Sequence, residues 1–552
     1  MRNTLSFIAV LVLSVLLVPV GMAQPEGFTK QDVLRGSVTP EREWWDLQRY
    51  KLAVEFMPDT KQIRGSNTIS FKALKTGSRM QIDLQEPLKI SKVLHGSNEL
   101  SFTRNGNVYL ISFPDEIKAG TEEQIKVIYG GTPVESKNPP WSGGITWDRD
   151  DLGEHFIQTT CQGIGASIWW PTKDHGYDEP DRGMQINVTV PERLVAVANG
   201  RLKNSTHDRA AKTKTYFWEV NNPINNYAVN VNIGNYVSFS EKYEGKGGAL
   251  DLQYWVLPHQ KELAMKQFKE APRTIEAFEH WFGPYPFYED SFKLVTVSYA
   301  GMEHQSSVTY GNWFRNGYRG RDLSGMGVGY LFDFIIVHET GHEWFGNNVS
   351  VKDVADLWVH EGFTNYSENL FVEYHFSKKQ AEDYVIGTRK LIQNKSPIIG
   401  TYGVNKSGSG DMYYKGGNML HTIRHAINDD KKWLGILRGL NKDFGLDTVT
   451  TRQVESYMSK KAGIDLSKVF DQYLRDTRIP KLWIEIRGNQ VYYRYENVIP
   501  GFSMPIRVKV NGKTFTLKPG ERLRALAVNK QIKNVEVDRN FYVTSEVKRA
   551  SP

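Results

Sequence analysis

Two histidines stand four residues apart in the segment IIVHETGHEWFG, residues 335–346, and a glutamate follows the first of them. If this segment is a helix, a spacing of four residues returns to nearly the same face, so His338 and His342 can both direct a ring nitrogen at one metal ion. Glu339 lies about 100° further round such a helix, where its carboxylate can hold a water molecule instead of the metal. This pattern alone does not separate a zinc site from a helix that happens to carry two histidines.

A third possible ligand, Glu361, follows in the segment LWVHEGFTNYSE. The apolar residues Leu357, Phe363 and Leu370 have the spacing of a second helix, with Glu361 near its start. Two histidine nitrogens and one carboxylate leave the fourth tetrahedral position free, as in catalytic zinc sites. Because no cysteine lies nearby to complete a structural site, we expect one catalytic zinc ion per chain.

Glu368 follows Glu361 by seven positions, which is almost the same face of a helix. It can accept a hydrogen bond from a ligand histidine and fix the tautomer of that ring, or it can be an ordinary solvent-exposed glutamate. Water on a zinc ion has its pKa lowered to about 7, and Glu339 can take its proton as a general base during attack on a carbonyl carbon. The spacing of ligands and base therefore predicts a zinc hydrolase.

Alternating apolar residues predict β structure on both sides of these helices. In YKLAVEF, Leu52, Val54 and Phe56 share one face, and similar runs continue to about residue 245. Helical spacing begins near residue 259, with a kink or break expected at Pro272, and alternation returns after residue 480. We expect a multidomain α+β protein with an N-terminal antiparallel β domain (24–245), a mainly helical catalytic domain (246–479) and a small C-terminal β domain (480–552).

Residues 1–23 combine an early arginine, an apolar run and small residues near the end, which is typical of a secretory signal cleaved before Gln24. A retained membrane anchor is the alternative, although the run is short for a transmembrane helix. After cleavage we expect no stable membrane span and a secreted or periplasmic protein. The only cysteine, Cys161, allows no internal disulfide, and we expect it to be a buried small side chain.

The chain has 69 Lys and Arg against 62 Asp and Glu, a formal charge of +7. We interpret these charges as scattered and as serving ordinary solubility, and we find no basic run or nucleic-acid motif. No nucleic-acid partner is expected. The sequence does not indicate an oligomeric state.

The segment HETGHEWFGNNVSVKDVADLWVHEGFTNYSE resembles the core of the aminopeptidase N family of zinc metallopeptidases, the gluzincin group that includes the leukotriene hydrolase/aminopeptidases. That family's pattern is H-E-x-x-H, eighteen residues, and then a glutamate within W-x-x-E-G. The resemblance covers about residues 45–480 and implies a thermolysin-like catalytic domain, zinc bound by His338, His342 and Glu361, and peptides as substrates. It also implies that the large C-terminal helical domain of many relatives is absent here.

YAGMEHQSS is similar to the family's G-x-M-E-N motif, and the resemblance implies that Glu303 binds the α-ammonium group of the substrate. It also implies that Gln162, in TTCQGIGASIWWPTKD, assists Glu303, although a structural glutamine at a sheet edge is the alternative. A carboxylate fixed there favours a free N-terminus, because an internal peptide leaves it unpaired. His304 stands where the family usually has asparagine. This difference affects either the local strand geometry or, if His304 titrates, the pH dependence of the activity near about pH 6 to 7.

DMYYKGG matches the family's Y-E-K-G segment in the register that makes Tyr413 the catalytic tyrosine, with Tyr414 as the alternative. A tyrosine hydroxyl near the metal can stabilise the oxyanion of a tetrahedral intermediate. We therefore predict a zinc aminopeptidase that removes N-terminal residues from peptides. The alternatives are a broader zinc hydrolase, such as an endopeptidase or an epoxide hydrolase, and an inactive binding scaffold, which would be expected to have lost ligands or the base.

Overall fold

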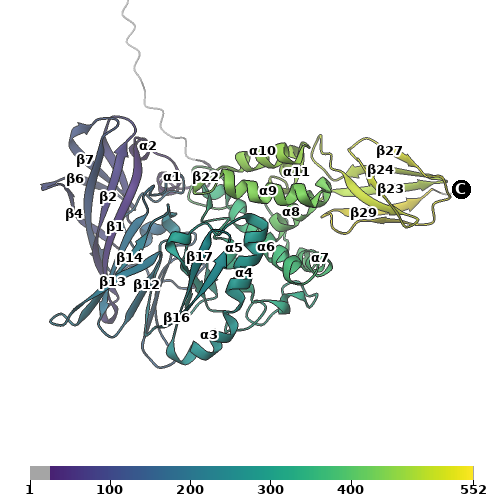
Figure 1. The fold of residues 1–552 in the computed structure, drawn as a ribbon. Coiled ribbons are helices and arrows are strands. Elements are labelled where there is room, and N and C mark those ends of the chain that lie inside the picture. The colour runs from purple at the N-terminus through teal and green to yellow at the C-terminus, as the bar shows by residue number, and fades with distance from the viewer. Residues whose placement is uncertain (1–24, 551–552) are drawn as a thin grey trace, which may run out of the picture.

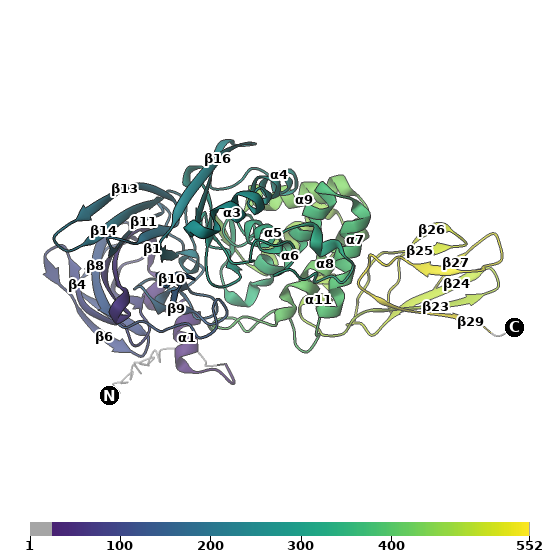
Figure 2. The same ribbon diagram turned by 90° about the horizontal axis from the view of Figure 1, so that it is seen from below.

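The computed structural model describes residues 25–550, so the predicted signal sequence at residues 1–23 lies outside the described part. The chain forms a β-rich N-terminal part, a helical middle part and a C-terminal β part that follow one another along the molecule (Figures 1 and 2). This order agrees with the predicted α+β architecture. Within residues 25–550, no helix is both long and apolar enough to span a bilayer.

Three sheets build the N-terminal part, and their strands form where the sequence alternates. Along β1 the buried residues Leu52, Val54 and Phe56 face the core and polar residues face outward. Pairing between these strands is antiparallel, as predicted, except between β1 and β11, which are parallel. The sheets, in strand order, are β13(Arg201–Asp208)-β14(Thr213–Val220)-β11(Met184–Pro191)-β1(Trp45–Met57)-β2(Gln62–Ala73)-β8(Glu122–Gly131)-β4(Lys89–His95)-β5(Asn98–Glu99), β12(Val195–Ala198)-β15(Val231–Gly234)-β10(His155–Thr160)-β9(Gly144–Arg149) and β3(Gly77–Asp83)-β7(Val108–Ile117)-β6(Ser101–Asn105).

A mixed five-stranded sheet joins this part to the helices. Its order is β16(Val237–Gly245)-β17(Gly248–Val256)-β18(Phe292–Thr296)-β20(Val308–Tyr310)-β19(Gly301–Met302). β16 and β17 pair as a hairpin, so the predicted domain boundary between residues 245 and 246 lies inside one sheet. β19 is an edge strand, and Glu303 follows it directly.

The helical part is organised around α6, whose residues from Trp358 to Val372 are all buried. A short parallel pair, β21(Val349–Val351) with β22(Asp447–Val449), lies beside the helices. The helix that was expected to break at Pro272 ends earlier, at Gln267, and a new helix starts at Glu270 with Pro272 in its first turn, where proline is tolerated. The helices of this part are α3(Lys261–Gln267), α4(Glu270–Phe282), α5(Phe334–Gly341), α6(Trp358–His375), α7(Lys378–Gly387), α8(Tyr414–Ile427), α9(Asp430–Asp443), α10(Thr451–Ala462) and α11(Ser467–Leu474).

The C-terminal part is a pair of small sheets that projects from the helices (Figure 1). Inward residues such as Leu482, Ile484 and Val508 are buried, and the residues between them are more exposed. The first sheet is β27(Arg524–Ala527)-β24(Gln490–Glu496)-β23(Lys481–Arg487)-β29(Thr544–Arg549), and the second is β26(Lys513–Leu517)-β25(Ile506–Val510)-β28(Val535–Val537).

Two short helices, α1(Lys30–Gly36) and α2(Pro40–Glu43), fold back onto the N-terminal sheets. The fully buried Arg42 guanidinium holds them there: it donates to the carbonyl oxygens of Arg35 (2.9 Å) and Ser37 (2.7 Å) and pairs with Asp83 Oδ2 at 2.6 Å. A buried carboxylate without its partner costs far more than an exposed one. Arg42 is therefore one of the side chains that hold α1 in position.

We expect Arg42→Ala to lower the free energy of unfolding by about 3–5 kcal/mol, because Asp83 would remain buried without its cation. Urea unfolding of both proteins measures this difference. Arg64→Ala is the control, because Arg64 pairs with Glu55 on the surface and its side chain is 68% exposed. Equal, small effects of the two substitutions would show that Arg42 does not hold α1 in place.

Candidate metal and catalytic site

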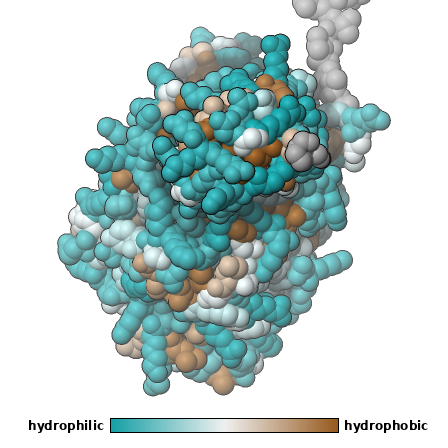
Figure 3. Space-filling view, turned by 90° about the vertical axis from the view of Figure 1, so that its right-hand side faces the viewer, coloured by the Kyte–Doolittle hydropathy of each residue, from teal (hydrophilic) through white to brown (hydrophobic). Residues whose placement is uncertain are grey.

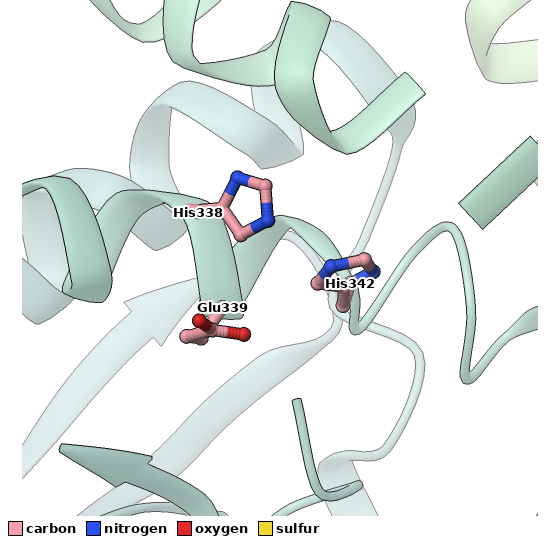
Figure 4. A group of neighbouring side chains, drawn as sticks. All are labelled: His338, Glu339 and His342. Atoms are coloured by element: carbon pink, nitrogen blue, oxygen red, sulfur yellow. The ribbon is translucent and has the colours of Figure 1, made fainter. Parts of the chain in front are cut away.

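Helix α5 carries the first two residues of the site, and the turn after it carries the third. The Asp333 carboxylate caps α5 by accepting from the Ile336 amide at 3.2 Å. His338 and Glu339 lie on the last turns, and His342 follows the helix end. Figure 4 shows these three side chains, with the Glu339 carboxylate directed toward His342.

Glu361, in the first turn of α6, brings its carboxylate to both imidazoles. Its Oε2 lies 3.7 Å from His338 Nε2 and 3.3 Å from His342 Nε2. The stacking of Phe345 on Phe363, with ring centroids 4.3 Å apart, holds the turn after α5 against α6. The structure thus brings together the three residues that were predicted as metal ligands.

The other nitrogen of each imidazole is occupied by an acceptor. His338 Nδ1 donates to Glu368 Oε1 at 2.7 Å, and His342 Nδ1 donates to the Phe345 carbonyl at 3.0 Å. Each Nδ1 therefore carries the proton in the neutral ring, and each Nε2 presents a lone pair toward Glu361. Glu361 Oε2 is itself buried and accepts no hydrogen bond.

Two nitrogen lone pairs and an unpartnered carboxylate oxygen that face one another form a donor set for a cation. Two imidazoles and one carboxylate are ligands that suit zinc in a site with an open position. One ligand atom each from His338, Glu339 and His342 also lies within 4.8 Å of the others, as does one each from Glu303, His342 and Glu361. The residues present therefore fit a zinc ion.

Glu368 is fully buried, which contradicts the solvent-exposed interpretation. Besides His338, its carboxylate accepts from Asn365 Nδ2 at 3.1 Å and from the Tyr384 hydroxyl at 2.6 Å. Three donors hold this carboxylate in one orientation. It can therefore orient the imidazole of His338.

The site opens into a cavity of about 320 Å³, which we call the metal-site cavity. Glu303, Glu339 and Glu361 all line it, and no Lys or Arg does. Burial is the main cause that raises the pKa of Glu339 to about 7, and the nearby Glu303 and Glu361 raise it further, whereas His338 and His342 lower it. The cavity thus holds more negative than positive charge, which favours binding of cations.

Glu303 is held at the edge of the site by two contacts. Its Oε1 accepts from the Tyr227 hydroxyl at 3.0 Å, and its backbone carbonyl accepts from Asn347 Nδ2 at 2.8 Å. Gln162 lines the same cavity, but the side chains of Gln162 and Glu303 are not hydrogen-bonded to each other. Both residues, with Glu361, also line a second cavity of about 260 Å³ that extends toward α1.

Tyr413 immediately precedes α8 and donates its hydroxyl to Glu361 Oε1 at 2.9 Å. Its ring stacks on that of His338, with 6.1 Å between centroids. Burial raises the pKa of Tyr413 well above its usual value, so the hydroxyl keeps its proton and remains a donor. Tyr414 also lines the metal-site cavity but has no hydrogen bond to these residues, so the contacts favour Tyr413.

His304 follows Glu303 but is completely buried, and neither ring nitrogen has a hydrogen-bond partner. Burial lowers its pKa to about 3. The ring is therefore neutral at pH 6 to 7, which excludes the predicted pH effect of His304 and leaves its effect on local packing.

Several residues around the site were not predicted from the sequence. Tyr227 lies in a 3₁₀ turn, Asn226–Ala228, within a segment read as a strand, so no pattern marked it. Asn365 stands three residues before Glu368 on α6, a spacing that could have indicated the contact. Tyr384 is on α7, and only the tertiary fold brings it to Glu368.

Part of the chain is similar to a known peptidase family. Residues 266–473 match the family model described as the peptidase family M1 domain. The chain is 21% identical to aminopeptidase 2 of Candida albicans over 472 residues (80% of this chain, 48% of that one) and 19% identical to leucyl aminopeptidase of Saccharolobus solfataricus over 518 residues (90% and 62%). It therefore spans between about half and three fifths of the length of these relatives.

A solved structure has a similar fold. It is a mutant of the M1 zinc metallopeptidase from Deinococcus radiodurans bound to a Tyr-Ser-Ala substrate, with a TM-score of 0.66, 19% identity, and coverage of 82% of this chain and 99% of that one.

We expect Glu368→Ala to weaken zinc binding by about 10- to 100-fold, because His338 would lose the acceptor that orients it. Competition with a chromogenic chelator measures the affinity. Glu276→Ala, at an exposed position on α4, is the control and should leave it unchanged. Unchanged zinc affinity in Glu368→Ala would contradict this role.

Proposed function

We propose that this chain, whose residues 266–473 match the peptidase family M1 domain, is a zinc-dependent aminopeptidase that hydrolyses N-terminal residues from peptides, with one zinc ion per chain. The observation that carries the proposal is the buried group of Glu303, Glu339 and Glu361 in a cavity without Lys or Arg. Two cations complete such a site: a metal ion on His338, His342 and Glu361, and the ammonium group of a peptide on Glu303.

Zinc, when bound, supplies a Lewis acid that polarises the scissile carbonyl group and activates a water molecule. Glu339 is the residue placed to accept the proton of the attacking water and to return it to the leaving amine. Its raised pKa, about 7, suits both steps near neutral pH. The hydroxyl of Tyr413 donates to the oxyanion as the tetrahedral intermediate forms.

Glu303 and Gln162 make the site selective for the N-terminal end of a peptide substrate. Tyr227 donates to one oxygen of the Glu303 carboxylate, and this leaves the other oxygen for the substrate ammonium. The Gln162 side-chain oxygen is an uncharged acceptor on the same cavity wall. A blocked or internal peptide would bury Glu303 without a partner, and this penalty favours free N-termini. The predicted signal sequence supports a secreted or periplasmic location for the enzyme.

We expect cleavage of aminoacyl fluorogenic amides, loss of activity after chelation, its return with zinc, and no cleavage of acetyl-capped forms. Glu303→Ala should lower kcat/KM for free-amine substrates on the order of 100-fold or more, because an ammonium group would lose its buried partner. Glu262→Ala, at an exposed position on α3, is the control. Cleavage of capped substrates, or unchanged kinetics in Glu303→Ala, would contradict the exopeptidase assignment.

We expect Tyr413→Phe to lower kcat on the order of 100- to 1000-fold with little change in KM, because the hydroxyl acts mainly on the oxyanion. Tyr414→Phe tests the alternative tyrosine and should stay close to the unsubstituted enzyme. Steady-state kinetics on one good amide substrate compares the two. The reverse pattern would assign the role to Tyr414.

A further inference from the structure

The positive charge of this protein is concentrated in its C-terminal β part. Residues 481–552 contain fourteen Lys and Arg against six Asp and Glu, a formal charge of +8, whereas the whole chain carries +7. Residues 1–480 therefore carry a formal charge of −1. This uneven distribution corrects the interpretation of the charges as scattered, and it makes one end of an elongated molecule strongly basic (Figure 1).

Eight of these cations are exposed and have no acidic partner within 4 Å among the described residues. One of them, Arg549, donates to backbone carbonyl oxygens. We call the other seven the basic edge: Lys509, Lys513, Lys518, Arg522, Arg524, Lys530 and Lys533. The two acids in the same stretch, Glu521 and Glu536, accept hydrogen bonds from the Gly501 amide and the Asn534 side chain. The positive charge of the basic edge is therefore not neutralised within the domain.

β26, β27 and the segment that connects them carry Lys513, Lys518, Arg522 and Arg524, whereas Lys509 lies on β25 and Lys530 and Lys533 lie between β27 and β28. β26 and β27 are edge strands of the two sheets. The Arg549 guanidinium donates to the carbonyl oxygens of Ile532 and Lys533, which puts β29 beside the segment that leads into β28. The opposite edges, β26 and β27, therefore share the other side, and residues 518–523 connect them there.

An exposed aliphatic side chain lies within the basic edge. Leu523 is 46% exposed and stands between Arg522 and Arg524. In Figure 3, which looks onto this end of the molecule, the near surface is largely hydrophilic with small hydrophobic areas between. Cations around an exposed aliphatic residue suit the boundary between lipid headgroups and acyl chains.

We propose that the C-terminal β part attaches this protein peripherally to anionic lipid bilayers through the basic edge, with Leu523 entering the interface. The exposed hydrophobic side chains of this part favour a bilayer over a nucleic acid. Binding of single strands uses exposed aromatic rings that stack on bases, and the large hydrophobic side chains exposed in residues 481–550 are Leu523 and Val547, neither of them aromatic. Each surface Lys or Arg adds an attraction that salt screens.

The test is cosedimentation of the full chain with vesicles of phosphatidylcholine alone and of an equal mixture with phosphatidylglycerol, at low and high salt. We expect binding to the anionic vesicles only, and its loss at high salt. The triple substitution Lys513→Gln, Lys518→Gln and Arg524→Gln should weaken partitioning on the order of 100-fold. Leu523→Ser should weaken it with the charge unchanged.

A matched triple substitution, Lys203→Gln, Lys266→Gln and Lys269→Gln, removes the same charge from exposed positions outside the domain and should bind as the parent does. Peptidase activity on a soluble amide should be equal in all variants, which separates this proposal from the proposed function. Absence of vesicle binding by the parent protein would overturn the proposal. The cations would then serve to prevent the sheet edges from pairing with other chains. Equal weakening by both triple substitutions, or binding of duplex DNA but not of vesicles, would also overturn it.

Discussion

The site depends on one electrostatic constraint, the burial of negative charge beside nitrogen lone pairs. Glu361 Oε2 faces the Nε2 atoms of His338 and His342 without a hydrogen bond, while Glu339 and Glu303 lie in the same cavity. The three carboxylates repel one another in a medium of low polarity. A cation bound among them removes the repulsion, so metal binding and the stability of this region are expected to be coupled.

The elements around the site hold these groups together. α5 and α6 supply the histidines and two of the glutamates, and the buried carboxylate of Glu368 links His338 to Asn365 and to Tyr384 on α7. The N-terminal β part contributes Tyr227, and Gln162 on the cavity wall. These side chains come from several separate segments of the chain, so the geometry of the site depends on the packing of whole domains.

The parts of the site that could be predicted from the sequence are those with local spacing. One helix and its end carry His338, Glu339 and His342, and the next helix carries Glu361 and Glu368. Helical periodicity was therefore enough to predict how the members of each group lie relative to one another. Tyr227 could not be predicted, because it meets Glu303 only through packing between segments that are 76 residues apart. The β16–β17 hairpin across residue 245 was also missed, since alternation marks strands but not the sheet to which they belong. The formal charge of the whole chain did not indicate a basic C-terminal part, because it does not show how the cations are distributed between this part and the nearly neutral residues 1–480.

The short distance between Glu303 and the metal ligands limits how far from its N-terminus a bound peptide could be cleaved. Oxygen atoms of Glu303 and Glu361 and a nitrogen of His342 lie within 4.8 Å of one another, and an extended residue spans about 3.3–3.6 Å. If the proposed function holds, a peptide with its amino group on Glu303 can bring only its first carbonyl carbon to the metal. On the proposed function, each turnover therefore shortens the peptide by one residue. The new N-terminus must then move forward to Glu303 before the next cleavage. Degradation of a long peptide would proceed as a ladder of products, each one residue shorter than the last.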